Sequence, residues 1–117
     1  MDAPVSQAEC RMIDVVQLIG GKWKLLILRQ LIYGGTKRFN ELRRSIDGVT
    51  QTMLTKQLRQ LQADGLVARR AYAEVPPRVE YTATARARDL DPFFRAMHAW
   101  GERHLPPPGA EAPRLAS

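Results

Sequence analysis

Four glycine-containing breaks divide the first half of this chain into short segments. They lie at Gly20-Gly21, Gly34-Gly35, Asp47-Gly48 and Asp64-Gly65. Glycine pairs and Asp-Gly pairs end helices and form tight turns, because glycine adopts backbone conformations that other residues avoid. Long helices are therefore excluded before residue 66, and the apolar spacing between the breaks predicts a succession of short ones.

Apolar residues between these breaks recur at three- and four-residue spacings, which predicts four helices. The first three are expected at about residues 9–19, 23–32 and 39–46, with a short strand at residues 36–38. The fourth begins at Thr50, whose hydroxyl group is a favourable N-cap, and runs to about Ala63.

The fourth predicted helix has two distinct faces. At 100° per residue, three leucines lie within about 60° of one another: Leu54, Leu58 and Leu61. Three polar side chains project from the opposite side: Thr52, Lys56 and Arg59. One face is therefore expected to pack in a core, and the other is free to contact a partner.

The chain changes character after Gly65. Residues 66–75 and 78–84 favour strands, and Pro76-Pro77 between them predicts the turn of a hairpin. A last helix is expected over residues 86–104, and the proline- and alanine-rich residues 105–117 are expected to be a disordered tail. The predicted fold is mainly α with a small β-hairpin wing, a winged helix-turn-helix in one domain (residues 9–104) after an arm (residues 1–8).

Length and composition favour a single cytoplasmic domain. The 117 residues suit one core, no apolar run approaches the roughly 20 residues that span a bilayer, and the N-terminus lacks the features of a signal peptide. The single cysteine, Cys10, cannot form an intramolecular disulfide bond, which fits a reducing compartment. We therefore expect no membrane association.

The net charge of +6 is concentrated in the middle of the chain. Residues 36–70 carry eight basic and three acidic residues, whereas residues 1–35 carry four and three and residues 71–117 carry six and six. A local basic excess is typical of a surface that contacts phosphates, because polyanion affinity comes largely from released counterions. Here the excess coincides with the predicted helix-turn-helix, which favours duplex DNA as the partner.

The second helix of a helix-turn-helix enters the major groove, so its polar residues are the candidates for reading bases: Gln51, Thr52, Thr55, Lys56 and Arg59. A second set of cations is expected to contact the DNA backbone or to lie on the wing: Lys37, Arg38, Arg43, Arg44, Arg69, Arg70 and Arg78.

Several short stretches also resemble one family, the HxlR-type regulators: Cys10 with residues 19–23 (IGGKW), residues 38–42 (RFNEL), residues 53–59 (MLTKQLR), residues 64–67 (DGLV) and residues 75–81 (VPPRVEY). Their order and spacing cover about residues 10–101. The resemblance implies a winged-helix homodimer that regulates nearby genes, with the first and last helices at the dimer interface. Candidate interface residues are the apolar side chains of those two helices: Ile13, Val16, Leu90, Phe93, Phe94, Met97 and Trp100.

Some features have more than one interpretation. Some regulators that resemble this chain sense oxidants or electrophiles through an N-terminal cysteine, but Cys10 is also compatible with a structural role. The aromatic stripe of the last helix suits dimer packing or a small-molecule effector pocket. An alternative function is a winged-helix module that binds protein or RNA without sequence-specific DNA binding.

Catalysis, a metal site and a cofactor are not expected. His98 and His104 are six residues apart and lack the spacing of a zinc pair. The one cysteine and two histidines lie near the ends of the chain, so no nucleophile with a neighbouring base is visible.

Overall fold

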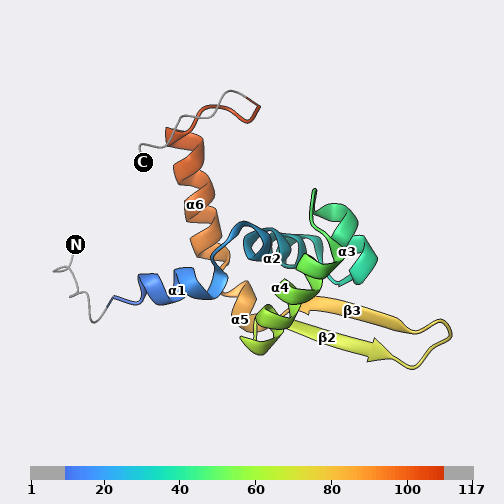
Figure 1. Ribbon diagram of the computed structural model, residues 1–117. Coiled ribbons are helices and arrows are strands. Elements are labelled where there is room, and N and C mark those ends of the chain that lie inside the picture. The colour runs from blue at the N-terminus through green and yellow to red at the C-terminus, as the bar shows by residue number, and fades with distance from the viewer. Residues whose placement is uncertain (1–9, 110–117) are drawn as a thin grey trace.

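The computed structural model describes residues 10–109 (Figure 1). In chain order this part of the molecule forms α1 (Met12–Ile19), α2 (Lys22–Gly34), β1 (Lys37–Arg38), α3 (Phe39–Ser45), α4 (Gln51–Ala63), β2 (Val67–Tyr72), β3 (Arg78–Ala83), α5 (Ala85–Arg88) and α6 (Asp91–His104). The predicted arm and residues 110–117 of the predicted tail lie outside the described residues. The winged helix-turn-helix prediction is confirmed, because α3 and α4 are followed directly by the hairpin β2–β3.

The core lies where α2, α3, α4 and the sheet meet. Buried leucines and isoleucines from three helices form its centre: Ile27, Leu28, Leu31, Leu42, Leu54, Leu58 and Leu61. Burying one such side chain contributes about 1.5–3 kcal/mol relative to leaving it exposed. The three leucines of α4 lie on the face predicted from the sequence, so the opposite face of α4 is left in solvent.

Both ends of α4 are fixed by local hydrogen bonds. At the start, the Thr50 Oγ1 atom accepts a hydrogen bond of 3.1 Å from the backbone N–H of Met53. At the end, Gly65 has a φ of +75°, and the N–H of Leu66 donates to the carbonyl of Leu61 at 2.9 Å. A residue with a side chain is disfavoured at such a φ, which explains the glycine there. Thr50 and Gly65 therefore bound α4 as the sequence predicts.

The three strands form an antiparallel sheet in the order β1-β3-β2. The hairpin register pairs Val67 with Ala83 at its base and Tyr72 with Arg78 at its distal end. Val67 and Ala83 are buried, so the base of the hairpin closes the core while its distal half extends away from the body (Figure 1). The predicted strand at residues 36–38 is β1, which pairs with β3.

The prediction of one helix over residues 86–104 is wrong, because the structure divides this segment into α5 and α6. Pro92 lies in the first turn of α6. Proline has no N–H to donate to the carbonyl four residues earlier, and its ring clashes with that carbonyl, so a continuous helix through residue 92 is disfavoured. The break occurs at Asp89 and Leu90.

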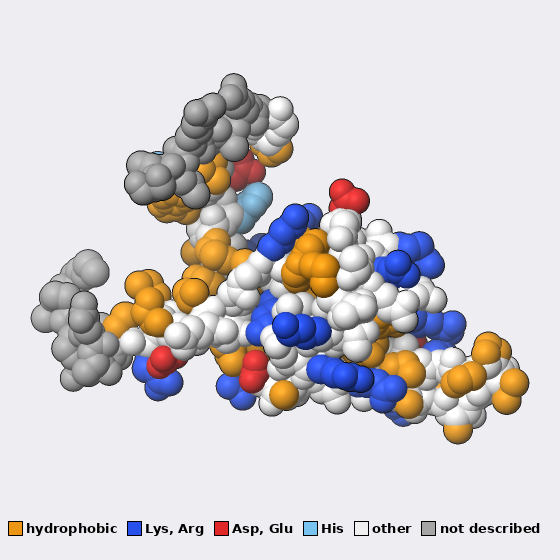
Figure 2. All heavy atoms as spheres, in the orientation of Figure 1, with side chains coloured by type: hydrophobic (Ala, Val, Ile, Leu, Met, Phe, Trp, Pro, Cys, Tyr) orange, Lys and Arg blue, Asp and Glu red, His pale blue; other side chains and the backbone are white. Residues whose placement is uncertain are grey.

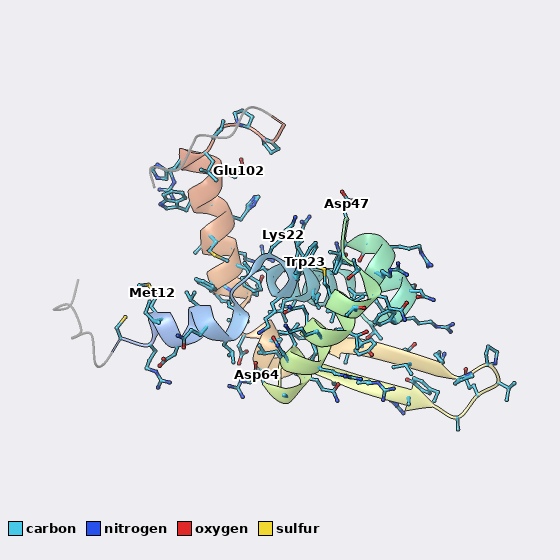
Figure 3. All side chains as sticks on the ribbon, in the orientation of Figure 1. Met12, Lys22, Trp23, Asp47, Asp64 and Glu102 are labelled. Carbon is cyan, nitrogen blue, oxygen red and sulfur yellow. The ribbon has the colours of Figure 1, made fainter. Side chains whose placement is uncertain are left out.

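Helices α1 and α6 project from the body in different directions (Figure 1). Helix α1 begins at Met12, three residues later than predicted, and Met12 lies far from the core (Figure 3). Helix α6 has no buried residue in this single chain. These two helices therefore expose apolar faces, as Figure 2 shows by the hydrophobic side chains gathered along them.

Candidate nucleic-acid interface

The solvent face of α4 carries the predicted base-reading residues. Gln51, Thr52, Lys56 and Arg59 are exposed, opposite the buried leucines. Thr55 differs from them, because it is half-buried and its hydroxyl group donates a hydrogen bond of 2.8 Å to the carbonyl of Gln51. Thr55 can therefore contact a base through its methyl group, or accept a hydrogen bond through its hydroxyl oxygen.

The turn between α3 and α4 is fixed by two buried residues of its own and by a hydrogen bond from α2. Ile46 and Val49 are buried on either side of Gly48, which has a φ of +81°. The side-chain amide of Gln30 on α2 donates to the carbonyl of Ser45 at 3.4 Å. Figure 3 labels Asp47 in this turn and Asp64 at the far end of α4. These contacts set the angle at which α4 presents its polar face.

The cations of α3 and β1 occupy different places. Arg43 and Arg44 are exposed in the last turn of α3, and Arg38 is exposed where α3 begins. Lys37 lies against the end of α2, where a Cβ atom on Gly34 would be only 3.2 Å from its Cε. The positive charge of Lys37 therefore lies near the carbonyl end of α2, where a cation is favourable. Figure 2 shows the basic side chains spread over the body of the molecule.

The wing arginines lie on two faces of the hairpin. Successive residues of a strand point to opposite faces, which separates Arg69 from Arg70. Arg69 lines the groove between the sheet and α4, together with Arg59. On the other face, the guanidinium groups of Arg70 and Arg78 lie 4.9 and 3.9 Å from the ring centroid of Tyr72. Only Arg69 of the three therefore adjoins the reading face of α4.

The predicted DNA-contacting cations also differ in their ion pairing. Within residues 10–109, Arg78 is the only one of them with a carboxylate oxygen within 4.0 Å. Its Nη2 atom is 3.1 Å from Glu74 Oε1, and its Nε atom is 4.0 Å from Glu80 Oε2. Sequence reasoning did not identify this cluster, because a turn centred on Pro76-Pro77 would place Tyr72 opposite Tyr81, whereas the observed register pairs Tyr72 with Arg78.

The candidate dimer residues fall into two groups. Five are exposed in the single chain: Ile13, Val16, Phe93, Met97 and Trp100, with Trp100 at 57%. The other two, Leu90 and Phe94, are half-buried and pack against the core of their own chain. The exposed group forms apolar stripes on α1 and α6 that have no partner among the described residues.

An open groove of about 980 Å³ separates α2 from α6. Phe94 and Met97 line it from α6, whereas Phe93 and Trp100 do not. The aromatic stripe considered as an effector pocket therefore divides between this groove and the exposed face of α6.

A polar contact at the edge of this groove joins α2 to α6. The Tyr33 hydroxyl group donates to Asp91 Oδ1 at 2.5 Å, and Arg95 Nε donates to the same carboxylate at 2.9 and 3.0 Å. The hydrogen bond from Tyr33, and after it the one from Arg95, holds the pKa of Asp91 below its ordinary value. The same bond to Asp91 raises the pKa of Tyr33. This contact fixes the first turn of α6 against the body.

The remaining site predictions concern Cys10, metal ions and membranes. Cys10 is a partly exposed free thiol that precedes α1. Among the residues that the structure describes, no three His, Cys, Asp or Glu side chains cluster as metal ligands would. None of the described helices has the length and apolar character needed to cross a bilayer.

Comparison with known proteins places these features in context. The family model for the HxlR-like helix-turn-helix matches residues 18–108. The chain is 48% identical over 93 residues to YybR, an uncharacterized HTH-type transcriptional regulator of Bacillus subtilis, which covers 80% of this chain and 74% of that protein. Two solved structures are also similar. The redox regulator HypR in its oxidized form shares 46% identity, with a TM-score of 0.73 and coverage of 81% of this chain and 97% of that chain. The reduced form of the regulator YodB from B. subtilis shares 32% identity, with a TM-score of 0.74 and coverage of 94% and 100%.

Proposed function

Because this chain belongs to the HxlR-like helix-turn-helix family of transcriptional regulators, we propose that it binds a specific duplex DNA sequence as a homodimer. The observation that carries the proposal is the polar face of α4, where Lys56 and Arg59 are exposed and have no ion pair with any described carboxylate. Such cations are free to bond base edges or phosphates without first breaking an internal contact.

The proposed roles follow from position. Arg59 and Lys56 bond guanine O6 and N7 in the major groove, Gln51 bonds adenine, and Thr52 and Thr55 contact bases through hydroxyl or methyl groups. Arg43 and Arg44 at the end of α3 contact backbone phosphates, and Arg69 extends the basic surface from α4 onto the wing. Phosphate contacts supply affinity, and α4 supplies sequence discrimination.

The proposed homodimer is supported by the exposed stripes on α1 and α6. Ile13, Val16, Met97 and Trp100 are large apolar side chains whose exposed surface is removed from water when a second copy packs on it. A two-fold dimer presents two copies of α4. We therefore expect a pseudo-palindromic site whose half-sites are about one helical turn apart, or a multiple of it.

Fluorescence anisotropy tests the proposal. The purified protein is titrated onto the intergenic duplex that flanks its own gene and onto a scrambled duplex, each over a range of salt concentrations. We expect the intergenic duplex to bind at least about a thousandfold more tightly than the scrambled one. Equal, weak and salt-sensitive binding to both would refute sequence-specific regulation and would favour the alternative, a winged-helix module for protein or RNA.

We also propose that Cys10 links oxidation to dimer geometry. Support comes from its partly exposed thiol beside α1, a proposed interface helix, and from the similarity to the redox regulator HypR and to the reduced form of the transcriptional regulator YodB. A peroxide oxidises the Cys10 thiol to a sulfenic acid and is reduced to water. The thiol of the partner's Cys10 then displaces a second water to form a disulfide bond.

Non-reducing gel electrophoresis after peroxide treatment tests this second proposal. We expect a covalent dimer from the wild-type protein and none from Cys10→Ser, with DNA affinity altered by peroxide only in the wild type. A peroxide-treated wild-type protein that keeps its DNA affinity would contradict the proposal and leave Cys10 with a structural role. DNA binding by reduced Cys10→Ser is expected to survive, which separates this proposal from the main one.

A further inference from the structure

The distal end of the wing contains a compact cluster of charged and aromatic side chains. The guanidinium group of Arg78 lies 3.9 Å from the ring centroid of Tyr72. It is also 3.1 Å from Glu74 and 4.0 Å from Glu80, measured between the nearest nitrogen and oxygen atoms. One arginine therefore joins both strands of the hairpin and the start of its loop.

This cluster lies where the hairpin ladder ends and its loop begins, so its contacts can restrain both. Tyr72 and Arg78 form the last pair of the β2–β3 ladder, and residues 73–77 form the loop beyond it. The backbone N–H of Glu74 donates to the carbonyl of Tyr72 at 2.9 Å, so the loop turns back on the strand at once. The Arg78–Glu74 ion pair spans this loop from its first half to the start of β3.

The exposure and charge of Arg78 argue against a direct role in binding phosphate. Its side chain is 26% exposed, and its Nε atom is buried. Two carboxylates already face it, and moving the guanidinium group to a phosphate would remove it from Glu74 and from the ring of Tyr72. In contrast, Arg69 and Arg70 are exposed and have no carboxylate within 4.0 Å among residues 10–109.

We infer that Arg78 is a positioning residue of the wing, which stiffens the loop and the ladder end so that Arg69 and Arg70 meet DNA in a fixed geometry. This inference rests on the proposed DNA binding. It differs from a direct contact of Arg78 with the DNA backbone, which is one of the two roles that the sequence offers for this set of cations. It also assigns Glu74, an acidic residue beside a proposed DNA interface, a favourable role in binding.

The two roles for Arg78 predict opposite effects of Glu74→Gln. If Arg78 binds phosphate, removing the Glu74 charge frees Arg78, removes repulsion from DNA, and tightens binding. If Arg78 positions the wing, the same change loosens the loop and weakens binding. From the usual worth of an exposed ion pair, we expect Glu74→Gln to weaken binding about 1.5-fold to 5-fold. Arg78→Met also loses the cation–π contact with Tyr72 and is expected to weaken binding about 3-fold to 30-fold.

The salt dependence of binding supplies a second test on the same variants. Each lost phosphate contact lowers the magnitude of the slope of log K against log salt by about 0.9. We expect Arg78→Met to leave this slope unchanged, because no phosphate contact is lost. Arg70→Met is the control on the same face of the hairpin: Arg70 is exposed, lies farther from the Tyr72 ring than Arg78 does, at 4.9 Å, and has no ion pair with a described carboxylate. Its removal is expected to lower the slope.

Amide hydrogen exchange of the free protein completes the experiment. Exchange at the distal end of β2 and β3 is expected to accelerate in Glu74→Gln and Arg78→Met but not in Arg70→Met. Tighter DNA binding by Glu74→Gln, a reduced salt slope for Arg78→Met, or unchanged exchange in both variants would overturn the inference. A wild-type protein that does not discriminate between duplexes would overturn the proposed function instead, and the exchange rates would still decide whether Arg78 stiffens the wing.

Discussion

Truncation of Arg59 to alanine tests the proposed reading face of α4 most directly. Arg59 is exposed on the face opposite Leu58 and Leu61, and no described carboxylate lies within 4.0 Å of it. Its removal therefore leaves no orphaned partner. The free energy of unfolding is expected to change by no more than about 0.5 kcal/mol, as for other exposed sites.

The expected loss in DNA binding is much larger than the change in stability. A guanidinium group bonded to guanine O6 and N7 contributes about 1–3 kcal/mol of discrimination, which corresponds to a Kd about 5-fold to 150-fold weaker per half-site. A homodimer carries two copies of Arg59, so the free-energy loss at a full site is about twice this value when the copies act independently. Binding to a scrambled duplex changes far less.

The assay is fluorescence anisotropy on the specific and scrambled duplexes, with thermal melting of each variant alongside. Arg103→Ala is the matched control, because Arg103 is an exposed cation in the last turn of α6 and its removal changes the net charge equally. At physiological salt the Debye length is about 8 Å, so a cation outside the interface has little effect. Equal losses for Arg59→Ala and Arg103→Ala, or equal losses on both duplexes, would refute the base-reading role.

Three further predictions follow from contacts described above. Thr50→Ala removes the acceptor for the Met53 N–H, so the free energy of unfolding should fall by about 1 kcal/mol and the melting temperature by about 4–8 °C. Thr50→Ser should keep most of the stability. Equal melting of wild type and Thr50→Ala would show that this cap is not formed in solution. Phe93→Glu places a charge on the exposed apolar stripe of α6 and should convert the dimer to a monomer in sedimentation experiments. Ala99→Glu, on another face of α6, should leave the dimer intact. A dimer that survives both changes would exclude this stripe from the interface. The pKa of Asp91 is lowered by Tyr33 and Arg95 in the folded protein, so the ionised carboxylate contributes stability above its unfolded pKa, and this contribution is lost as the pH falls through the lower folded pKa. Urea unfolding should therefore show Asp91→Asn to be less stable than wild type at pH 7, with the difference shrinking in acid; a difference independent of pH would contradict the assignment.

The sequence was sufficient to predict elements whose signals are local. Glycine at the breaks, the threonine cap of α4 and the leucine spacing of α4 each report a backbone conformation or a helix face directly. The order of the elements then identified the fold. The sequence analysis did not predict the break between α5 and α6, because the apolar stripe from Leu90 to Trp100 is consistent with one helix. Pro92 was the signal for this break, since proline is favourable in the first turn of a helix and disfavoured in its interior.

The roles of the charged residues were harder to predict, because they depend on contacts between distant segments. Lys37 lies against the end of α2, and Arg78 is enclosed by Tyr72 and two glutamates. A count of charged residues in the sequence treats both side chains as cations without partners. The alternation of residues along β2 was visible in the sequence and would have separated Arg69 from Arg70, but which face adjoins α4 depends on how the sheet packs.

The break before α6 makes that helix a lever arm. Its 14 residues span about 21 Å at 1.5 Å per residue. A rotation of about 10° at Asp89 and Leu90 displaces the far end by about 3.7 Å, close to the roughly 3.4 Å rise of one base pair. In a dimer joined through α6, a small change in the Tyr33–Asp91 contact would thus move each reading helix relative to the interface by about one base-pair step.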